Sequence, residues 1–287
     1  MSSFRDTTAE VRDAFATAGL FPPPERIAFL RARVKQRGAV ELSRLRRQAG
    51  ADVWDGGIAR IDARDAKRSV QWALGHGAQL TGFAVAPLGL DGAQSRRVEE
   101  LGALTNLVVT LYDNLLDQGI APERVLSEDF RSGDPLITAL VRLHYASADA
   151  LTNQGARPLL NSVIRRMYCA ENAAATMRDR RRKSALPFVV MGVAGWLATA
   201  TLPVSRIGHL HFLYRCGVTL GLVDDAVDFA SDAAAERPNS WRDGASVRHA
   251  ARSMSNALDW WRRRSSASEE ADWFRYCVFE WLRPRES

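Results

Sequence analysis

The chain has 287 residues, of which 46% are hydrophobic and 25% charged, and its formal net charge at pH 7 is +6. This composition is that of an ordinary globular protein and argues against a disordered chain. The three cysteines, Cys169, Cys216 and Cys277, fit neither an even set of disulfides nor a Cys-x-x-Cys metal site. Such cysteine usage predicts a reducing compartment, the cytoplasm.

Helical patterns cover most of the chain, and the alternating β-branched runs that indicate strands are scarce. Thr7-Thr8-Ala9-Glu10 predicts a capping box for a short first helix, and the next apolar-periodic run, 25–47, is interrupted by Gly38. Further helices are predicted over 64–80, 95–117, 135–151, 158–182, 186–198, 205–230, 247–264 and 269–281. The sequence therefore predicts an all-α bundle, and the lack of a Pro/Gly/Ser-rich linker favours a single domain over residues 1–287.

One stretch, residues 184–205, contains no charged side chain and is long enough to cross a bilayer. Pro187, Gly192, Gly195 and Pro203 interrupt it, which favours a buried helix over a membrane span. The first residues of the chain also lack the charged-then-apolar layout of a signal peptide. The sequence therefore predicts no transmembrane segment.

Two aspartate series each end an apolar run. Asp224, Asp228 and Asp232 fall at i, i+4 and i+8, so on a continuous helix their carboxylates share one face. Carboxylates stacked beside apolar residues raise one another's pKa unless cations lie among them. Asp113 and Asp117 form a second pair one helical turn apart. Two such sets facing each other across a cavity would suit Mg²⁺, which binds through a few carboxylates together with substrate phosphates.

The alternative for these aspartates is a solvated helix face, which is the more common origin of acidic residues at helical spacing. Both series, however, lie among large apolar residues such as Leu111, Val223 and Phe229 and not among Lys and Glu. That context favours a metal site and a substrate that carries a phosphate or diphosphate.

The two segments Asp113–Asp117 (DNLLD) and Asp224–Asp228 (DDAVD) resemble the first and second aspartate-rich motifs of class I isoprenoid enzymes, the trans-prenyltransferases and class I terpene synthases. Between them, Lys183–Phe188 (KSALPF) resembles the Lys-Thr segment of prenyltransferases, and the similarity spans roughly residues 100 to 232. The resemblance implies an isoprenoid-synthase-like bundle around a central apolar cavity and a prenyl diphosphate substrate. It also implies a cluster of three Mg²⁺ ions, with the metal ligands Asp113, Asp117, Asp224, Asp228 and Asp232.

The same resemblance assigns cationic side chains to the departing diphosphate. Lys183 is the first candidate, with Arg182 and Arg178 on the same helical approach and Arg237 after the second motif. Arg180, in the middle of the basic run, is interpreted as a solvated side chain together with its neighbour Arg181. Candidates for the aromatic wall of a dry pocket are Tyr112, Phe188, Trp196, Tyr214 and Phe229.

Departures from the prenyltransferase pattern favour a terpene synthase. Chain-elongating enzymes carry an early Gly-Gly-Lys-Arg element, tandem arginines after the first motif and a Gln before the second. This chain has Gly56-Gly57-Ile58, only Arg124, and Gly221 at those places. In that family the first two elements hold the second, homoallylic diphosphate. Their absence predicts an enzyme that ionises one allylic prenyl diphosphate and cyclises or quenches the carbocation.

Three alternatives stay open at this stage. The first is a prenyltransferase that condenses an allylic diphosphate with isopentenyl diphosphate. The second is a catalytically silent partner subunit of such an enzyme. The third alternative is a nucleic-acid-binding protein, because Arg178–Lys183 and Arg262–Arg264 are basic runs. No nucleic-acid-binding motif supports it, so no nucleic acid partner is expected. Members of this superfamily are often dimers, so the resemblance allows a homodimer and leaves the oligomeric state open.

Overall fold

The computed structural model describes residues 6–64, 70–117, 134–151, 157–172, 176–199, 202–265 and 269–283. Side chains are described over the same ranges apart from 59–64, 112–117, 157 and 171–172. Within these ranges the chain is helical and contains no strand, which confirms the predicted all-α class. No helix of the described ranges is long and apolar enough to cross a membrane.

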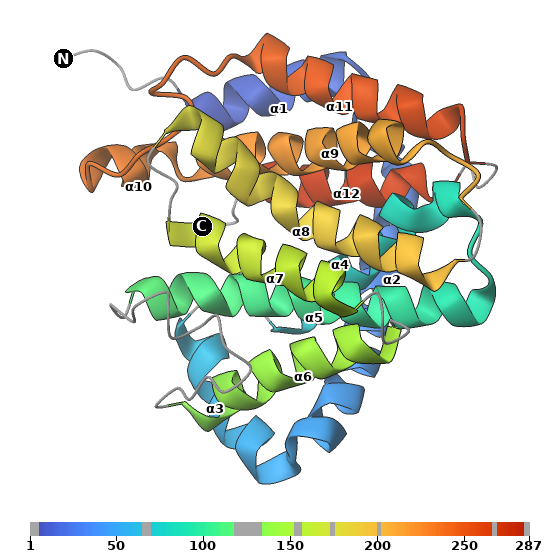
Figure 1. Cartoon of the computed structure of the whole chain (residues 1–287). Helices are drawn as coiled ribbons and strands as arrows, with labels where there is room; N and C mark the ends of the chain where they lie inside the picture. The colour runs from blue at the N-terminus through green and yellow to red at the C-terminus, as the bar shows by residue number, and fades with distance from the viewer. Residues whose placement is uncertain are drawn as a thin grey trace.

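The helices pack side by side as a bundle (Figure 1). In chain order they are α1 Thr7–Thr17, α2 Pro24–Ala49, α3 Ala51–Arg64, α4 Val70–Val85, the short 3₁₀ helix η1 Ala86–Leu88, α5 Gly92–Asp117, α6 Pro135–Leu151, α7 Arg157–Asn172, α8 Met177–Ala198, α9 Arg206–Val227, α10 Phe229–Ala234, α11 Val247–Arg262 and α12 Ala271–Leu282. Helix α4 contacts α2 and α5, and α8 contacts α5, α7 and α9. Helix α9 is in turn packed against α11.

Helix α4 is central because it is apolar on nearly all sides and buried along most of its length. Small residues let its neighbours approach closely. A Cβ at Gly75 would overlap the backbone of Val34 on α2, and a Cβ at Gly77 would lie 2.7 Å from the carbonyl oxygen of Gly102 on α5. One apolar cluster fills the space from α3 to α8, and a second joins α1, α4, α8, α9, α11 and α12.

Several predicted helix boundaries were wrong, and packing explains one of them and helix capping another. Helix α2 continues through Gly38, where a Cβ would overlap the carbonyl of Gln71 on α4, so this glycine serves a close contact and not a break. Helix α8 continues through Pro187 and begins only at Met177, after Thr176, whose hydroxyl accepts a hydrogen bond from the Asp179 amide at 3.2 Å. The predicted helix over 158–182 is therefore two helices, α7 and α8.

Two helix ends also differ from the sequence prediction. The first helix is capped by Asp6, whose carboxylate accepts from the Ala9 amide at 3.0 Å, and not by a capping box at Thr7. Helix α9 ends at Val227, and Asp228 separates it from the short α10. Figure 1 shows α10 extending beyond the end of the bundle where α9 ends and α8 begins.

Candidate functional site

The second acidic motif is positioned by a close crossing of α8 and α9. Gly217 and Gly221 of α9 lie against Ser184 of α8, where a Cβ on either glycine would overlap the serine. On α9, Asp224 and Asp228 follow these glycines at i+7 and i+11 from Gly217, so all four positions form one stripe along the helix. The crossing therefore brings both aspartates alongside the first turns of α8.

Asp224 is oriented by the C-terminal helix. Its Oδ1 accepts a hydrogen bond of 2.9 Å from the indole nitrogen of Trp281 on α12, and the residue is half-buried. Asp228 is also half-buried and lies at the end of α9, where its amide donates to the Asp224 carbonyl at 3.0 Å. Both residues are thus close to the surface, and Asp224 is supported by a second helix, α12.

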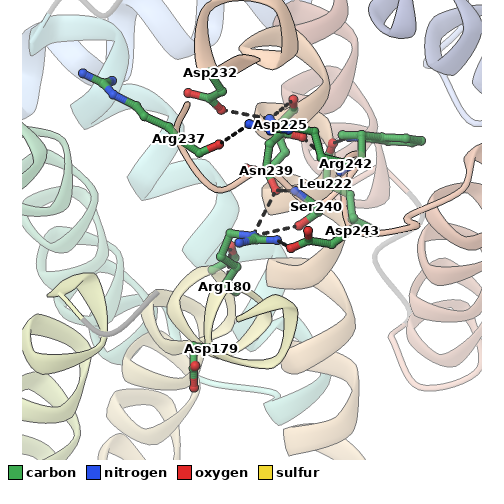
Figure 2. A network of polar contacts seen from close by, with 12 residues as sticks. Asp179, Arg180, Leu222, Asp225, Asp232, Arg237, Asn239, Ser240, Arg242 and Asp243 are labelled. Carbon is green, nitrogen blue, oxygen red and sulfur yellow. Dashed lines mark hydrogen bonds and ion pairs between the residues drawn. The ribbon is translucent and has the colours of Figure 1, made fainter. Parts of the chain in front are cut away.

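Asp225 points to the other side of α9, into a polar network with a buried arginine (Figure 2). Arg180 is only 7% exposed, and its Nε lies 3.9 Å from Asp225 Oδ2 and 3.4 Å from the Ser240 hydroxyl. The same guanidinium pairs with Asp243, while the Ser240 amide donates to Asp225 Oδ2 at 2.9 Å. The prediction that Arg180 is solvated is wrong, because it joins α8 to α9 and to the segment that follows α10.

Asn239 holds that segment, residues 235–246, against the end of α9. It is fully buried, and its Nδ2 donates to the Asp225 carbonyl at 2.7 Å and to Asp232 Oδ2 at 2.8 Å. Its Oδ1 accepts from the Trp241 amide at 3.0 Å, and the Trp241 indole donates to the Leu222 carbonyl at 2.8 Å. The aspartate at the third position of the motif, Asp232, is thus bound by an amide of the chain itself.

Burial dominates the electrostatics of Asp225. It raises the pKa of this carboxyl, and the charge of neighbouring Asp224 raises the pKa further. The hydrogen bonds from Ser240 and the charge of Arg180 act in the opposite direction. One guanidinium nitrogen of Arg180, Nη1, is buried without a hydrogen-bond partner among the described residues. Arg180 therefore provides the positive charge that favours an ionised Asp225 beside Asp224.

The four predicted diphosphate ligands differ in their surroundings. Lys183 is half-buried on α8, one residue before Ser184 at the crossing with α9, whereas Arg178 and Arg182 are exposed on the same helix. Arg237 is exposed in the segment after α10, and Figure 2 shows its guanidinium pointing away from the network around Asn239. Lys183 is therefore the one that lies nearest to the helix crossing.

The first acidic motif ends α5. Asp113 and Asp117 belong to its last two turns, one turn apart as predicted, and their side chains lie outside the described residues. In Figure 1 this end of α5 lies at the same end of the bundle as the start of α8, the end of α9 and α10. Helix α8 contacts both α5 and α9. The two motifs and the basic start of α8 thus belong to one end of the molecule.

The chemistry of these carboxylates fits Mg²⁺. Among the described side chains, no three or more His, Cys, Asp or Glu come together as a metal-binding group. Asp224 and Asp228 nevertheless supply two carboxylates one turn apart, and Mg²⁺ commonly uses one or two carboxylates and completes its shell with water and substrate phosphate. Asp225 and Asp232 already accept hydrogen bonds from Ser240 and Asn239. Asp224 also accepts one, from the Trp281 indole, so the choice of Asp224 and Asp228 as metal ligands rests on their spacing of one turn at the end of α9.

Three of the predicted aromatic residues have different surroundings, and the side chain of a fourth, Tyr112, lies outside the described residues. Phe188 is buried and lies edge-on to Phe274, with ring centroids 6.3 Å apart. The indole nitrogen of Trp196 donates to His209 Nδ1 at 2.8 Å. Tyr214 lies on the outside of α9 with 39% of its surface exposed, so its predicted place in an internal pocket wall is wrong.

No protein-family model matches the chain, and comparisons with curated proteins and with solved structures found no match. The resemblance of the two aspartate motifs therefore rests on the residues themselves.

Sequence reasoning missed the residues that support the second motif. They are Arg180, Asn239, Ser240, Asp243 and Trp281. The basic run around Arg180 offered one signal. Consecutive basic residues on a helix point in different directions, so one of them faces the interior, and a buried arginine needs an anionic partner. For Trp281 there was no signal, since its partner lies 57 residues away in the chain.

Proposed function

We propose that the protein is a Mg²⁺-dependent class I terpene synthase that ionises a linear allylic prenyl diphosphate and cyclises or quenches the resulting carbocation. The observation that carries the proposal is the position of the DNLLD and DDAVD motifs. Each ends a helix, α5 or α9, both helices contact α8, and the basic start of α8 lies at the same end of the bundle. An anionic leaving group bound there would meet carboxylates for metal ions and cations for phosphate.

Each described residue has a distinct task in this proposal. Asp224 and Asp228 would hold Mg²⁺, together with Asp113 and Asp117 of the first motif. Bound Mg²⁺ would act as a Lewis acid on the diphosphate oxygens. Lys183 would bind the leaving group from the helix crossing, and the positive end of the α8 dipole would add to its charge. The exposed Arg178, Arg182 and Arg237 would reach diphosphate oxygens from the solvent side.

Trp281 and Arg180 would set the geometry of the motif without touching substrate. The Trp281 indole donates to one oxygen of Asp224 and would fix the orientation of this carboxylate toward a bound metal. Arg180, together with the hydrogen bonds from Ser240, partly offsets the burial of Asp225, the residue adjacent to Asp224. These contacts from Trp281 and Arg180 would hold the metal ligands in place, as the hydrogen-bond partners of metal ligands commonly do.

The contact between Gly221 and Ser184 explains one of the departures from the elongase pattern. The chain-elongating enzymes that this chain resembles carry Gln near position 221. In this chain even a Cβ at position 221 would overlap the Ser184 hydroxyl. A Gln side chain would therefore require α8 and α9 to separate. The departure from the elongase pattern is thus part of how the two helices pack.

The decisive experiment incubates purified protein and Mg²⁺ with geranyl, farnesyl or geranylgeranyl diphosphate, each with and without isopentenyl diphosphate. Products are analysed by gas chromatography and mass spectrometry. Hydrocarbon or alcohol formed without isopentenyl diphosphate is the expected result, and chelation of the metal should abolish it. Longer diphosphates formed only with isopentenyl diphosphate would instead assign a prenyltransferase. Lack of reaction with any substrate would count against both activities.

Substitution of the motif separates chemistry from folding. Asp224→Asn keeps an oxygen that can accept from the Trp281 indole but removes the charge that a metal requires. We expect turnover to fall by about two orders of magnitude or more, in the range lost when key charge-stabilising groups are removed, with an unchanged circular dichroism spectrum. The matched control is Asp259→Asn, an exposed aspartate on α11, for which wild-type turnover is expected. Wild-type turnover in Asp224→Asn would refute the site assignment.

A further inference from the structure

The outer face of α9 carries exposed apolar side chains that no helix covers. Ile207, Leu210 and Tyr214 are 70%, 38% and 39% exposed, and they follow one another at i, i+3 and i+7. Three of the six large hydrophobic side chains that the structure shows as exposed lie in this short stretch. The spacing places them on one side of the helix, between the flanks that contact α8 and α11.

Basic side chains surround this apolar stripe. Arg206 and Arg215 are exposed at its two ends on α9 itself. The guanidinium of Arg264 lies 4.7 Å from the ring of Trp260, which packs beside Gly208 at the start of α9. On α11, the Ser253 hydroxyl donates to the Arg215 carbonyl at 3.2 Å, which places that turn of α11 next to the far end of the stripe.

The adjoining turn of α11 extends the basic surface toward α8. Arg252 precedes Ser253 on α11 and is exposed. Burial lowers the pKa of His249, and the positive charges of Arg181 and Arg252 lower it further. Acidic residues are scarce here. Helix α9 has none before Asp224, and the single one on α11, Asp259, lies 3.5 Å from Arg262.

The combination of an apolar stripe and a basic border limits what can bind. In a twofold dimer the same patch meets itself, so its basic border, which includes Arg206, Arg215 and Arg252, would face a second basic border without acidic partners. A nucleic acid would match the charge but would leave Ile207 and Leu210 without an apolar partner. An anionic bilayer satisfies both, because apolar side chains enter the interface, tyrosine suits the headgroup level and arginine binds lipid phosphate.

We propose that this face of α9, with its border of arginines from α9 and α11, docks the protein on the surface of an anionic lipid bilayer. The proposal is independent of the proposed enzyme activity. The proposed binding is peripheral, because only the three side chains of the stripe would enter the bilayer. Helix α9 would lie in the plane of the membrane interface. The face belongs to the outside of the bundle, so docking does not require the fold to open.

The test is flotation of the purified full-length chain with vesicles of phosphatidylcholine mixed with phosphatidylglycerol, and with vesicles of phosphatidylcholine alone, at low and high salt. We expect binding to the anionic vesicles that weakens as salt rises. Ile207→Ser combined with Leu210→Ser should lower the partition coefficient about tenfold by removing buried apolar surface. Arg215→Glu combined with Arg252→Glu should lower it at least about tenfold through the lost and reversed charges.

The control is Val40→Ser on α2, which removes an equally exposed apolar side chain from another helix and should leave binding unchanged. Wild-type protein that fails to bind anionic vesicles, or that binds neutral vesicles equally well, would overturn the proposal. Unchanged binding by both double variants would do the same. Light scattering that shows a dimer which Ile207→Ser with Leu210→Ser disperses would assign the face to a second copy of the chain instead. Tighter binding to a DNA duplex than to vesicles would assign it to nucleic acid.

Discussion

Asn239→Ala tests whether residues 235–246 are held in place by one side chain. Asn239 is fully buried and makes three hydrogen bonds through its amide, two as donor and one as acceptor. A typical intramolecular hydrogen bond contributes about 1 kcal/mol, and one to a charged group about 1.5–3 kcal/mol. Asp232 is half-buried and is rehydrated in part when the amide is lost, so we expect the free energy of unfolding to fall by about 2–4 kcal/mol.

A second substitution at the same position changes the charge while keeping the shape. Asn239→Asp replaces the donating nitrogen by an oxygen that faces the Asp225 carbonyl and the Asp232 carboxylate. Both contacts favour a protonated new carboxyl, so its pKa in the folded state is raised above that in the unfolded chain. A raised folded-state pKa means that stability is present at low pH and is lost as the pH rises. The variant should therefore recover part of its stability on acidification.

Urea unfolding followed by far-ultraviolet circular dichroism measures both effects, with the transition midpoint at constant slope as the readout. The control is Arg237→Ala, an exposed neighbour that should change the free energy of unfolding by less than about 0.5 kcal/mol. An Asn239→Ala variant as stable as this control would refute the reasoning. So would an Asn239→Asp variant whose stability relative to wild type does not depend on pH.

Three further predictions concern the motif and the buried ionisable groups. Trp281→Phe removes the hydrogen bond to Asp224 and should lower turnover about tenfold while reducing the free energy of unfolding by only about 1 kcal/mol. Steady-state release of diphosphate measures turnover, and urea unfolding measures stability. Unchanged turnover would contradict the role given to the indole. Burial lowers the pKa of His76 and His209 to about 4 and that of His144 to about 3. The unfolded chain therefore binds protons first as the pH falls below 6.5, and the free energy of unfolding should fall toward pH 4 by on the order of 2–3 kcal/mol per histidine. A free energy of unfolding that stays constant over this pH range would show that these rings are not buried in the neutral form. Burial and a neighbouring glutamate raise the pKa of Glu270 to about 7, so the fold loses stability as the pH rises from 4.5 to about 7. Glu270→Gln should be more stable than wild type at about pH 8 and equal to it below pH 4.5. Equal stability at both pH values would contradict the shift.

Local pattern was sufficient to predict the helical class and the chain positions of the two motifs. Apolar periodicity identified most of the helices, and Asp113 and Asp117 do end α5, one turn apart. Their ligand role stays a prediction, because their side chains lie outside the described residues. Helix breaks were predicted less well. Gly38 lies in the middle of α2 because α4 packs against it, and no local rule separates that use of glycine from a break.

The acidic series at the end of α9 shows the same division. Spacing correctly placed Asp224 and Asp228 one turn apart, but it could not show that the helix ends at Val227 or that Asn239 binds Asp232. Nor could it show which residue in the basic run of α8 is buried. Arg180 is buried because the segment after α10 returns with Ser240 and Asp243, 60 and 63 residues further along the chain.

The amino-acid sequence by itself determined that this protein is built of amphipathic and apolar helices, two of which end in aspartates, because helix formation and side-chain periodicity depend on residues three or four apart. Only the tertiary structure decided which aspartate is oriented by Trp281, which is balanced by Arg180, and which apolar side chains are left uncovered on α9. These are contacts between segments that are distant in the chain. They depend on how helices pack, and packing is fixed by the whole fold and not by any local pattern.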